Sequence, residues 1–348
     1  MAKSEEPQRK KVMRSKGPLD PNTLRKTTMT QERQRSAQNR KAAKRDKEDE
    51  KRMKPLMKVL KAVHDLGGEE TTSPAALKRQ RQSHEDLGRL ITPMIGMEWE
   101  TFDLDGMPCA WTRPDRGHDR RHAILYCHGG GYTSGALNYS RILSSKLSHV
   151  TGYPVMSFQY RLAPENPYPA ALEDGMKAWD HLMHLGFGAR DVVIAGDSAG
   201  GNMALCLALK LKEEGRLMPR AMILMSPWTD LSAKGKSYQE NKALDPMITL
   251  SYIHAVRSAY AGEKADFTDP RLSPLYASLK GLPPTLIQVG TNEILLSDSV
   301  RLRDKLVLNG VPCRLEVWQD MFHVFQMFPL RQAGEAMDAI GHFLLEMS

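Results

Sequence analysis

The sequence has few cysteines and no long apolar run. Its 348 residues include four cysteines, none of them in a CxxC pair, so we expect reduced, mostly buried thiols. No stretch approaches the roughly 18 consecutive apolar residues of a membrane span. The opening segment MAKSEEPQRK lacks the apolar centre of a secretory signal. We therefore expect a cytoplasmic protein rather than a secreted or membrane-spanning one.

Net positive charge is scarce outside the first fifty residues. The formal net charge is +8, yet residues 1–50 hold fifteen Lys and Arg against eight Asp and Glu, so the remainder is close to neutral. A basic tail can bind nucleic acid or an acidic membrane surface by releasing counterions. No aromatic side chain stands among these charges. We therefore favour a solvated arm, partly disordered or helical, over a nucleic-acid or membrane contact.

Strand-like and helix-like segments alternate from about residue 97. Two runs joined by Asp105-Gly106, MEWETFDL and MPCAWTRP, predict an antiparallel hairpin. Most of the later apolar runs do not alternate with polar residues, which is typical of strands covered on both faces. These runs are HAILYCH, YPVMSFQY, DVVIAGD, RAMILMSP, PTLIQVG and CRLEVWQ. The order predicts an α/β fold with a mostly parallel sheet and helices on both sides.

One segment interrupts this rhythm. Residues 235–280 predict one or two inserted helices and a proline-rich return. We divide the chain into an N-terminal extension (1–50), a helical segment (51–95) and an α/β domain (96–348) with an insertion around 235–275. Ligands of open α/β sheets bind outside the carboxyl ends of the strands. We therefore expect the helical segment and the insertion to form a cap over that edge.

A serine stands between a strand-like and a helix-like run, in Gly196-Asp197-Ser198-Ala199-Gly200. The pattern G-x-S-x-G in a strand–turn–helix context predicts a nucleophile elbow. The serine must adopt a sparsely populated backbone conformation. Side chains at positions 196 and 200 would clash with neighbouring backbone, which explains both glycines. The alternative is a close-packed turn with an unreactive serine, and the context favours the nucleophile.

Three consecutive glycines follow the strand HAILYC, at Gly129, Gly130 and Gly131. Hydrolysis of an acyl bond creates an oxyanion that needs preorganised donors. We expect the amides of these glycines, together with the amide of Ala199, to supply them. His128 precedes the loop, where a base would face away from the serine, so we expect it to brace the loop. An ordinary flexible loop is the alternative.

These motifs resemble one family, the hormone-sensitive-lipase-like branch of the α/β-hydrolase esterases. The resemblance covers about residues 90–348 and leaves out the first fifty. It implies an eight-stranded sheet, a helical cap built partly from N-terminal residues, hydrolysis of carboxylic esters, and neither a metal nor a cofactor. The residues that carry it are HGGGY (128–132), YRLAPENPYPAALED (160–174), GDSAGGN (196–202), SPWTDLS (226–232) and FHVFQ (322–326).

A serine nucleophile needs a base and an orienting carboxylate, which this fold supplies in the order Ser, Asp or Glu, His. Among the eleven histidines, His323 alone sits in a loop after the last predicted strand. Glu293 and Asp298 are the candidate acids. The family usually has aspartate in D-P-L-x-D here, and this sequence departs from that pattern. We favour Glu293, which lies nearer the strand end and matches a G-x-x-E-x-L form, and we expect Asp298 to cap the next helix.

The motifs thus predict hydrolysis of carboxylic esters by a Ser198, His323 and Glu293 triad through an acyl-enzyme, and the family resemblance implies short- to medium-chain acyl esters as substrates. The expected partner is a small-molecule ester, with no cofactor and no metal. One alternative is deacetylation of acetylated sugars or amides by the same triad. Another is a non-catalytic ligand-binding relative, against which the presence of His323 counts. A homodimer is compatible with the sequence, which does not fix the oligomeric state.

Overall fold

The computed structural model of the protein describes residues 72–90 and 94–347. The expected N-terminal extension (1–50) lies outside the described residues, and the expected helical segment (51–95) is described only in part. Helix α2 (Pro74–Leu90) is the described portion of that segment. None of the described helices is both long and apolar enough to cross a membrane.

The described residues contain an eight-stranded sheet with the order β1-β2-β4-β3-β5-β6-β7-β8. Strands β1 and β2 form the expected antiparallel hairpin, β2 also runs antiparallel to β4, and the other pairings are parallel. The prediction of a mostly parallel, eight-stranded α/β-hydrolase sheet is confirmed. The strands are β1 (Met97–Leu104), β2 (Met107–Pro114), β3 (Ala123–Cys127), β4 (Val155–Phe158), β5 (Val192–Asp197), β6 (Ala221–Met225), β7 (Thr285–Gly290) and β8 (Cys313–Trp318).

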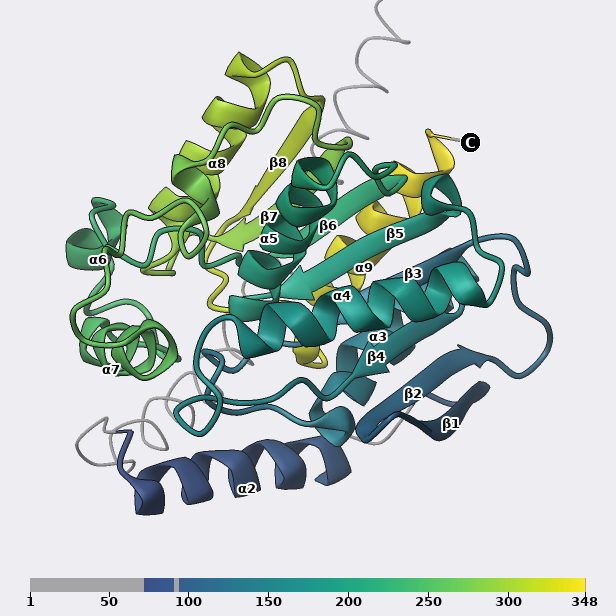
Figure 1. Cartoon of the computed structure of the whole chain (residues 1–348), viewed down its shortest axis with the longest axis horizontal. Helices are drawn as coiled ribbons and strands as arrows, with labels where there is room; N and C mark the ends of the chain where they lie inside the picture. The colour runs from purple at the N-terminus through teal and green to yellow at the C-terminus, as the bar shows by residue number, and fades with distance from the viewer. Residues whose placement is uncertain (1–71, 91–93, 348) are drawn as a thin grey trace, which may run out of the picture. The chain divides into compact units, whose positions relative to one another are not determined.

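Helices cover both faces of this sheet, as the alternating pattern predicts. Helices α4 and α5 pack together over one face, and α3 packs with α9 over the other (Figure 1). After α2, the helices are α3 (Leu137–Thr151), α4 (Ala170–His184), α5 (Ala199–Glu213), α6 (Ser237–Glu240), α7 (Leu250–Ala261), α8 (Leu296–Leu308) and α9 (Arg331–Leu345). Short 3₁₀ turns are η1 (Ala189–Asp191), η2 (Pro274–Tyr276) and η3 (Phe325–Met327).

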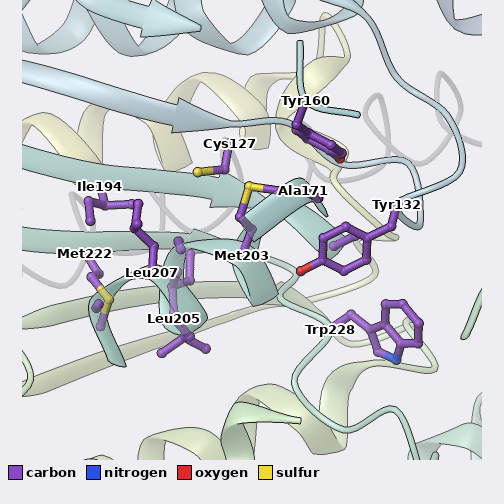
Figure 2. Packing of buried hydrophobic residues seen from close by; sticks show 14 of the residues in the cluster. Cys127, Tyr132, Tyr160, Ala171, Ile194, Met203, Leu205, Leu207, Met222 and Trp228 are labelled. Atoms are coloured by element: carbon purple, nitrogen blue, oxygen red, sulfur yellow. The ribbon is translucent and has the colours of Figure 1, made fainter. Parts of the chain in front are cut away.

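Buried apolar side chains lie on both faces of the sheet, and the cluster that supports the site lies between α5 and the central strands. Every residue of β3 and β5 is buried, which is why their apolar runs do not alternate. Figure 2 shows Met203 and Leu207 of α5 beside Cys127, Ile194 and Met222 of three neighbouring strands. All four cysteines are free thiols, and three of them are buried, as expected. This packing gives the turn between β5 and α5 a rigid base.

The chain between β6 and β7, residues 226–284, forms what we call the β6–β7 insertion. It contains α6, α7 and η2, in agreement with the expected inserted helices. Figure 1 shows α6 and α7 beyond the end of the sheet toward which the arrow of β5 points. The loop that holds Gly129, Gly130 and Gly131 is called the glycine loop. Helix α7 contacts it, since a Cβ on Gly131 would lie 2.7 Å from Tyr252 Oη and 3.1 Å from Val256 Cγ1. The insertion therefore lies at the edge where the strands end.

Helix α2 packs against the start of α3 and the loop before it. Arg81 donates to the Thr133 carbonyl at 2.9 Å and forms an ion pair with Glu165 at 2.7 Å. A Cβ on Gly88 would lie only 2.3 Å from the Asn138 backbone, so α2 and α3 approach closely there. The loop that α2 contacts follows the three glycines directly in the sequence.

Candidate active site

Ser198 lies in the turn between β5 and α5. Its backbone has φ 54° and ψ −121°, outside the regions that residues with a side chain prefer. Two close approaches of backbone define the turn. A Cβ on Gly196 would lie 2.2 Å from the Gly200 oxygen, and a Cβ on Gly200 would lie 2.0 Å from the Cys127 oxygen. The expected steric demand for glycine at both positions is confirmed.

The backbone of Ser198 is held on both sides while its hydroxyl is not used by the turn. The N–H of Ser198 donates to the Met225 carbonyl at 2.9 Å, and its carbonyl accepts from the Trp228 N–H at 3.0 Å. Ser198 occupies the N-cap position of α5, yet its side chain makes no capping hydrogen bond. The amino end of α5 carries partial positive charge, which favours negative charge developing beside it. The turn can therefore present a half-buried hydroxyl for attack on a carbonyl.

The glycine loop follows β3, the strand that pairs with β5. Gly130 has φ 112° and Gly131 has φ 61°, conformations that glycine adopts without strain. Among the residues that the structure describes, nothing accepts a hydrogen bond from the amides of Gly130, Gly131 or Ala199. Unpaired amides at fixed positions are the donors that an oxyanion requires.

Gly129 differs from the expectation for the oxyanion loop. Its amide donates to Asp197 Oδ1 at 2.9 Å. Asp197 is fully buried, and the same carboxylate oxygen accepts from the Tyr126 hydroxyl at 2.5 Å. A Cβ on Gly129 would lie 2.3 Å from Asp197 Oδ2, so this glycine makes room for the carboxylate. The Gly129 amide is occupied and supports the loop instead of facing a substrate.

His128 braces the glycine loop, as we expected. Its Nδ1 donates to the Gly129 carbonyl at 2.7 Å, and its ring stacks on Tyr160 with centroids 4.1 Å apart. Burial lowers the pKa of His128 to about 4, so the imidazole is neutral at physiological pH. A neutral, fully buried ring bonded to the loop backbone serves to position that loop.

His323 and Glu293 contact each other at the carboxyl edge of the sheet. Glu293 follows β7 and His323 follows β8, and His323 Nδ1 lies 3.1 Å from Glu293 Oε2. Both side chains are buried. A carboxylate accepts only, so Nδ1 carries the proton and Nε2 is left as the basic nitrogen. The pair has the arrangement of a base and its orienting acid.

Nearby carboxylates shift the pKa of His323. Burial by itself lowers that pKa, but the hydrogen bond and charge of Glu293 and the charges of Asp245 and Asp197 outweigh burial and raise it. The imidazolium form is therefore stabilised by its surroundings. This stabilisation is useful to a base that becomes protonated during a reaction.

Ser226 links the loop that carries Glu293 to the loop that carries His323. The sequence analysis did not identify it as a site residue. Its hydroxyl donates to Glu293 Oε1 at 2.8 Å and accepts from the Val324 N–H at 3.1 Å. Glu293 Oε1 also accepts from the Gly290 N–H at 2.5 Å. Ser226 follows β6 directly and lies next to Met225, whose carbonyl binds Ser198. The sequence did contain a signal for Ser226: it is a serine directly after β6, and β6 pairs with the strand that carries the nucleophile.

Asp298, the other candidate acid, binds the start of the β6–β7 insertion. It is fully buried, and its Oδ2 accepts from the amides of Thr229 and Asp230 at 2.8 and 2.9 Å and from the Tyr238 hydroxyl at 3.3 Å. The prediction that Asp298 caps α8 is wrong, since the cap position is Leu295. The carboxylate holds the start of the β6–β7 insertion by accepting from two amides of that loop. Burial, followed by the charge of Asp230, raises the pKa of Asp298 to about 8.

No group of three His, Cys, Asp or Glu side chains in the described part of the chain could hold a metal ion. The groups that the site brings to the carboxyl edge of the sheet are a hydroxyl, an imidazole, a carboxylate and backbone amides. Together these groups can transfer an acyl group to a serine and then to water.

Comparisons with known proteins agree with this chemistry. A family model described as alpha/beta hydrolase fold matches residues 124–327. The chain is 39% identical over 222 residues to an esterase of Acinetobacter venetianus, covering 63% of this chain and 73% of that protein. It is 36% identical over 286 residues to an acetyl-hydrolase of Streptomyces hygroscopicus, covering 81% of this chain and 91% of that protein.

A solved structure is also similar. The crystal structure of an esterase from the bacterial hormone-sensitive lipase family superposes with a TM-score of 0.77 at 32% sequence identity, covering 84% of this chain and 98% of that one. The similarity therefore extends over nearly the whole of that enzyme.

Proposed function

Since this chain belongs to the hormone-sensitive-lipase-like branch of the α/β-hydrolase esterases and is a carboxylesterase, we propose that Ser198, His323 and Glu293 form its catalytic triad. The observation that carries this proposal is the 3.1 Å contact between His323 Nδ1 and Glu293 Oε2. It stands at the same sheet edge as a serine whose hydroxyl makes no capping bond. Asp298, the other candidate acid, contacts backbone amides instead.

The proposed reaction passes through an acyl-enzyme. Ser198 Oγ attacks the ester carbonyl while His323 Nε2 takes the hydroxyl proton, and Glu293 stabilises the resulting imidazolium. The imidazolium then protonates the leaving alcohol as the carbon–oxygen bond breaks. Water, deprotonated by the same imidazole, attacks the acyl-enzyme and releases the acid and free Ser198.

We propose the amides of Gly130, Gly131 and Ala199 as the oxyanion hole. Ala199 is the first residue of α5, so helix geometry leaves its N–H without an internal acceptor. The two glycine amides lie in a loop braced by His128 and Asp197. Donors fixed in this way stabilise the tetrahedral intermediate without reorganising during the reaction.

The cap expected from the sequence is likewise a proposal. Support comes from two contacts with the oxyanion loop region. Helix α7 of the β6–β7 insertion packs on Gly131, and α2 binds the Thr133 carbonyl through Arg81. Elements that contact the glycine loop and the residues that follow it are placed to enclose an ester there.

Substrate preference gives the first test. Because one relative is an acetyl-hydrolase, we propose short- to medium-chain acyl esters as substrates. Across p-nitrophenyl esters from acetyl to decanoyl, we expect kcat/KM to be highest for the short and medium chains and to fall for the longest. For acetylated sugars, with acetate release as the assay, we expect a lower kcat/KM than for these esters. A higher kcat/KM on an acetylated sugar would favour the deacetylase alternative.

The pH dependence follows from the shifted pKa of His323. The imidazole must be neutral to accept the serine proton, so kcat/KM falls as the pH decreases through that pKa. Because the surrounding carboxylates outweigh burial and raise the pKa, we expect the acidic limb to have its midpoint above the ordinary value of 6.5. Rates measured from about pH 5 to pH 9 on an ester with a non-ionising leaving group give this midpoint. A midpoint below 6.5 contradicts the assignment.

A further inference from the structure

The loop that carries Glu293 is bonded to two side chains of the β6–β7 insertion. Asn241 Nδ2 donates to the Thr291 carbonyl at 2.9 Å and to the Glu293 carbonyl at 2.7 Å. Asp245 Oδ2 accepts from the Ile294 N–H at 2.9 Å. The peptide unit between Glu293 and Ile294 is thereby bound at both of its polar atoms. Fixing that peptide plane restricts the direction in which the Glu293 side chain leaves the backbone.

The two side chains are themselves held in place. Asp245 Oδ1 accepts from the amides of Met247 and Ile248 at 2.9 and 3.1 Å. The Asp245 N–H donates to the Asn241 carbonyl at 3.0 Å, which joins the two residues in one turn. This turn lies between α6 and α7, so the insertion presents a preformed pair of partners to the Glu293 loop.

Both side chains are withdrawn from solvent, with exposures of 9% for Asn241 and 6% for Asp245. A buried carboxylate is costly unless hydrogen bonds compensate, and three backbone amides do so here. Burial raises the pKa of Asp245 to about 6, while the neighbouring charge of His323 acts in the opposite direction. The carboxylate therefore has an electrostatic connection to His323 as well as a bond to the Glu293 loop.

We propose that Asn241 and Asp245 are positioning residues for ester hydrolysis, holding Glu293 in contact with His323 from the β6–β7 insertion. This inference rests on the proposed triad. Neither residue is bonded to the reacting atoms: both hold the peptide that follows Glu293, and the charge of Asp245 acts in addition on His323. The insertion thus contributes to the catalytic machinery and does not only enclose the substrate. A loop that ended β7 without these partners would leave the acid less well oriented.

The test uses kcat, KM and pH profiles of the full chain. Asp245→Asn keeps the shape but loses the charge and one acceptor, and Asn241→Leu removes both donated bonds. We expect each to lower kcat on the order of 10- to 100-fold with little change in KM, because the acid is misplaced rather than the ester. In Asp245→Asn we also expect a lower midpoint of the acidic limb. The reason is that Glu293, Asp245 and Asp197 raise the pKa of His323, and this substitution removes the negative charge of Asp245.

Ser273→Ala is the matched control. Ser273 is a buried residue of the same insertion whose hydroxyl donates to the Phe267 carbonyl and accepts from the Leu231 N–H, both at 2.7 Å. It touches neither Glu293 nor His323. We expect this variant to lose thermal stability, measured as Tm by circular dichroism, while kcat and the acidic limb stay unchanged. If it reproduces the kcat loss and the pH shift, the positioning role is overturned.

A double-mutant cycle separates this inference from the triad on which it rests. In a Glu293→Gln background the acid is already lost. We therefore expect Asp245→Asn or Asn241→Leu to lower kcat by less than about a further threefold in that background. Full multiplication of the losses overturns the positioning role. If Glu293→Gln alone has no effect, the proposed triad fails instead. Should Asn241→Leu not fold, the near-isosteric Asp245→Asn completes the cycle by itself.

Discussion

Ser198→Ala should abolish ester hydrolysis, with kcat on p-nitrophenyl acetate lowered on the order of a millionfold, as when a triad nucleophile is removed. The loss follows because no oxygen remains to form the acyl-enzyme. Fold and stability should persist, since the Ser198 hydroxyl makes no capping bond and alanine has the same Cβ as serine. Steady-state rates, corrected for spontaneous hydrolysis, together with circular dichroism provide the measurement.

Ser278→Ala is the control for this result, because Ser278 is exposed and lies after η2. It should keep the full rate. Wild-type enzyme quenched in acid during turnover should carry the acyl mass on the peptide that contains Ser198, and the Ser198→Ala variant should not. A variant that retains more than about a thousandth of the wild-type rate would refute Ser198 as the nucleophile.

Glu293→Gln should have the second largest effect, a fall in kcat on the order of ten-thousandfold. The carboxylate accepts from the Gly290 N–H and the Ser226 hydroxyl through Oε1 and from His323 through Oε2. A glutamine must keep its oxygen toward the Gly290 amide, so its NH₂ group faces Nδ1 of His323. That contact favours the tautomer with the proton on Nε2, which cannot accept the serine proton.

Asp298→Asn is the comparison that decides between the two acids. With a pKa raised to about 8, Asp298 is largely protonated at neutral pH, so asparagine removes little charge. Its amide oxygen can still accept from Thr229 and Asp230, and no described residue forms a hydrogen bond with Asp298 Oδ1. We expect kcat to stay within about threefold of wild type. Near-normal activity in Glu293→Gln with a collapse in Asp298→Asn would reverse the assignment.

Several elements contact the carboxylate of Glu293. Ser226 after β6 and Gly290 at the end of β7 bind one of its oxygens, and His323 after β8 contacts the other. The peptide that follows is bound from the β6–β7 insertion. An acid held by so many partners keeps one orientation, which is the condition for fixing the tautomer of the base.

The sequence by itself determined the features that arise from local backbone constraints. Short non-alternating apolar runs predicted the buried strands, and the β–α order predicted the parallel sheet. Gly196 and Gly200 were predictable because a Cβ at either position meets backbone within the same strand–turn–helix unit or its neighbouring strand. The position of His323 after the last strand followed from the chain order of this fold.

Only the tertiary structure decided which side chain binds which partner. Glu293 and Asp298 lie five positions apart, yet one contacts His323 and the other contacts amides about seventy residues away in the chain. The occupied amide of Gly129 likewise depends on Asp197 of a neighbouring strand. Periodicity and steric limits act over a few residues and can be read from the chain. Hydrogen-bond partners at the carboxyl edge of the sheet come from separate loops, and only folding brings those loops together.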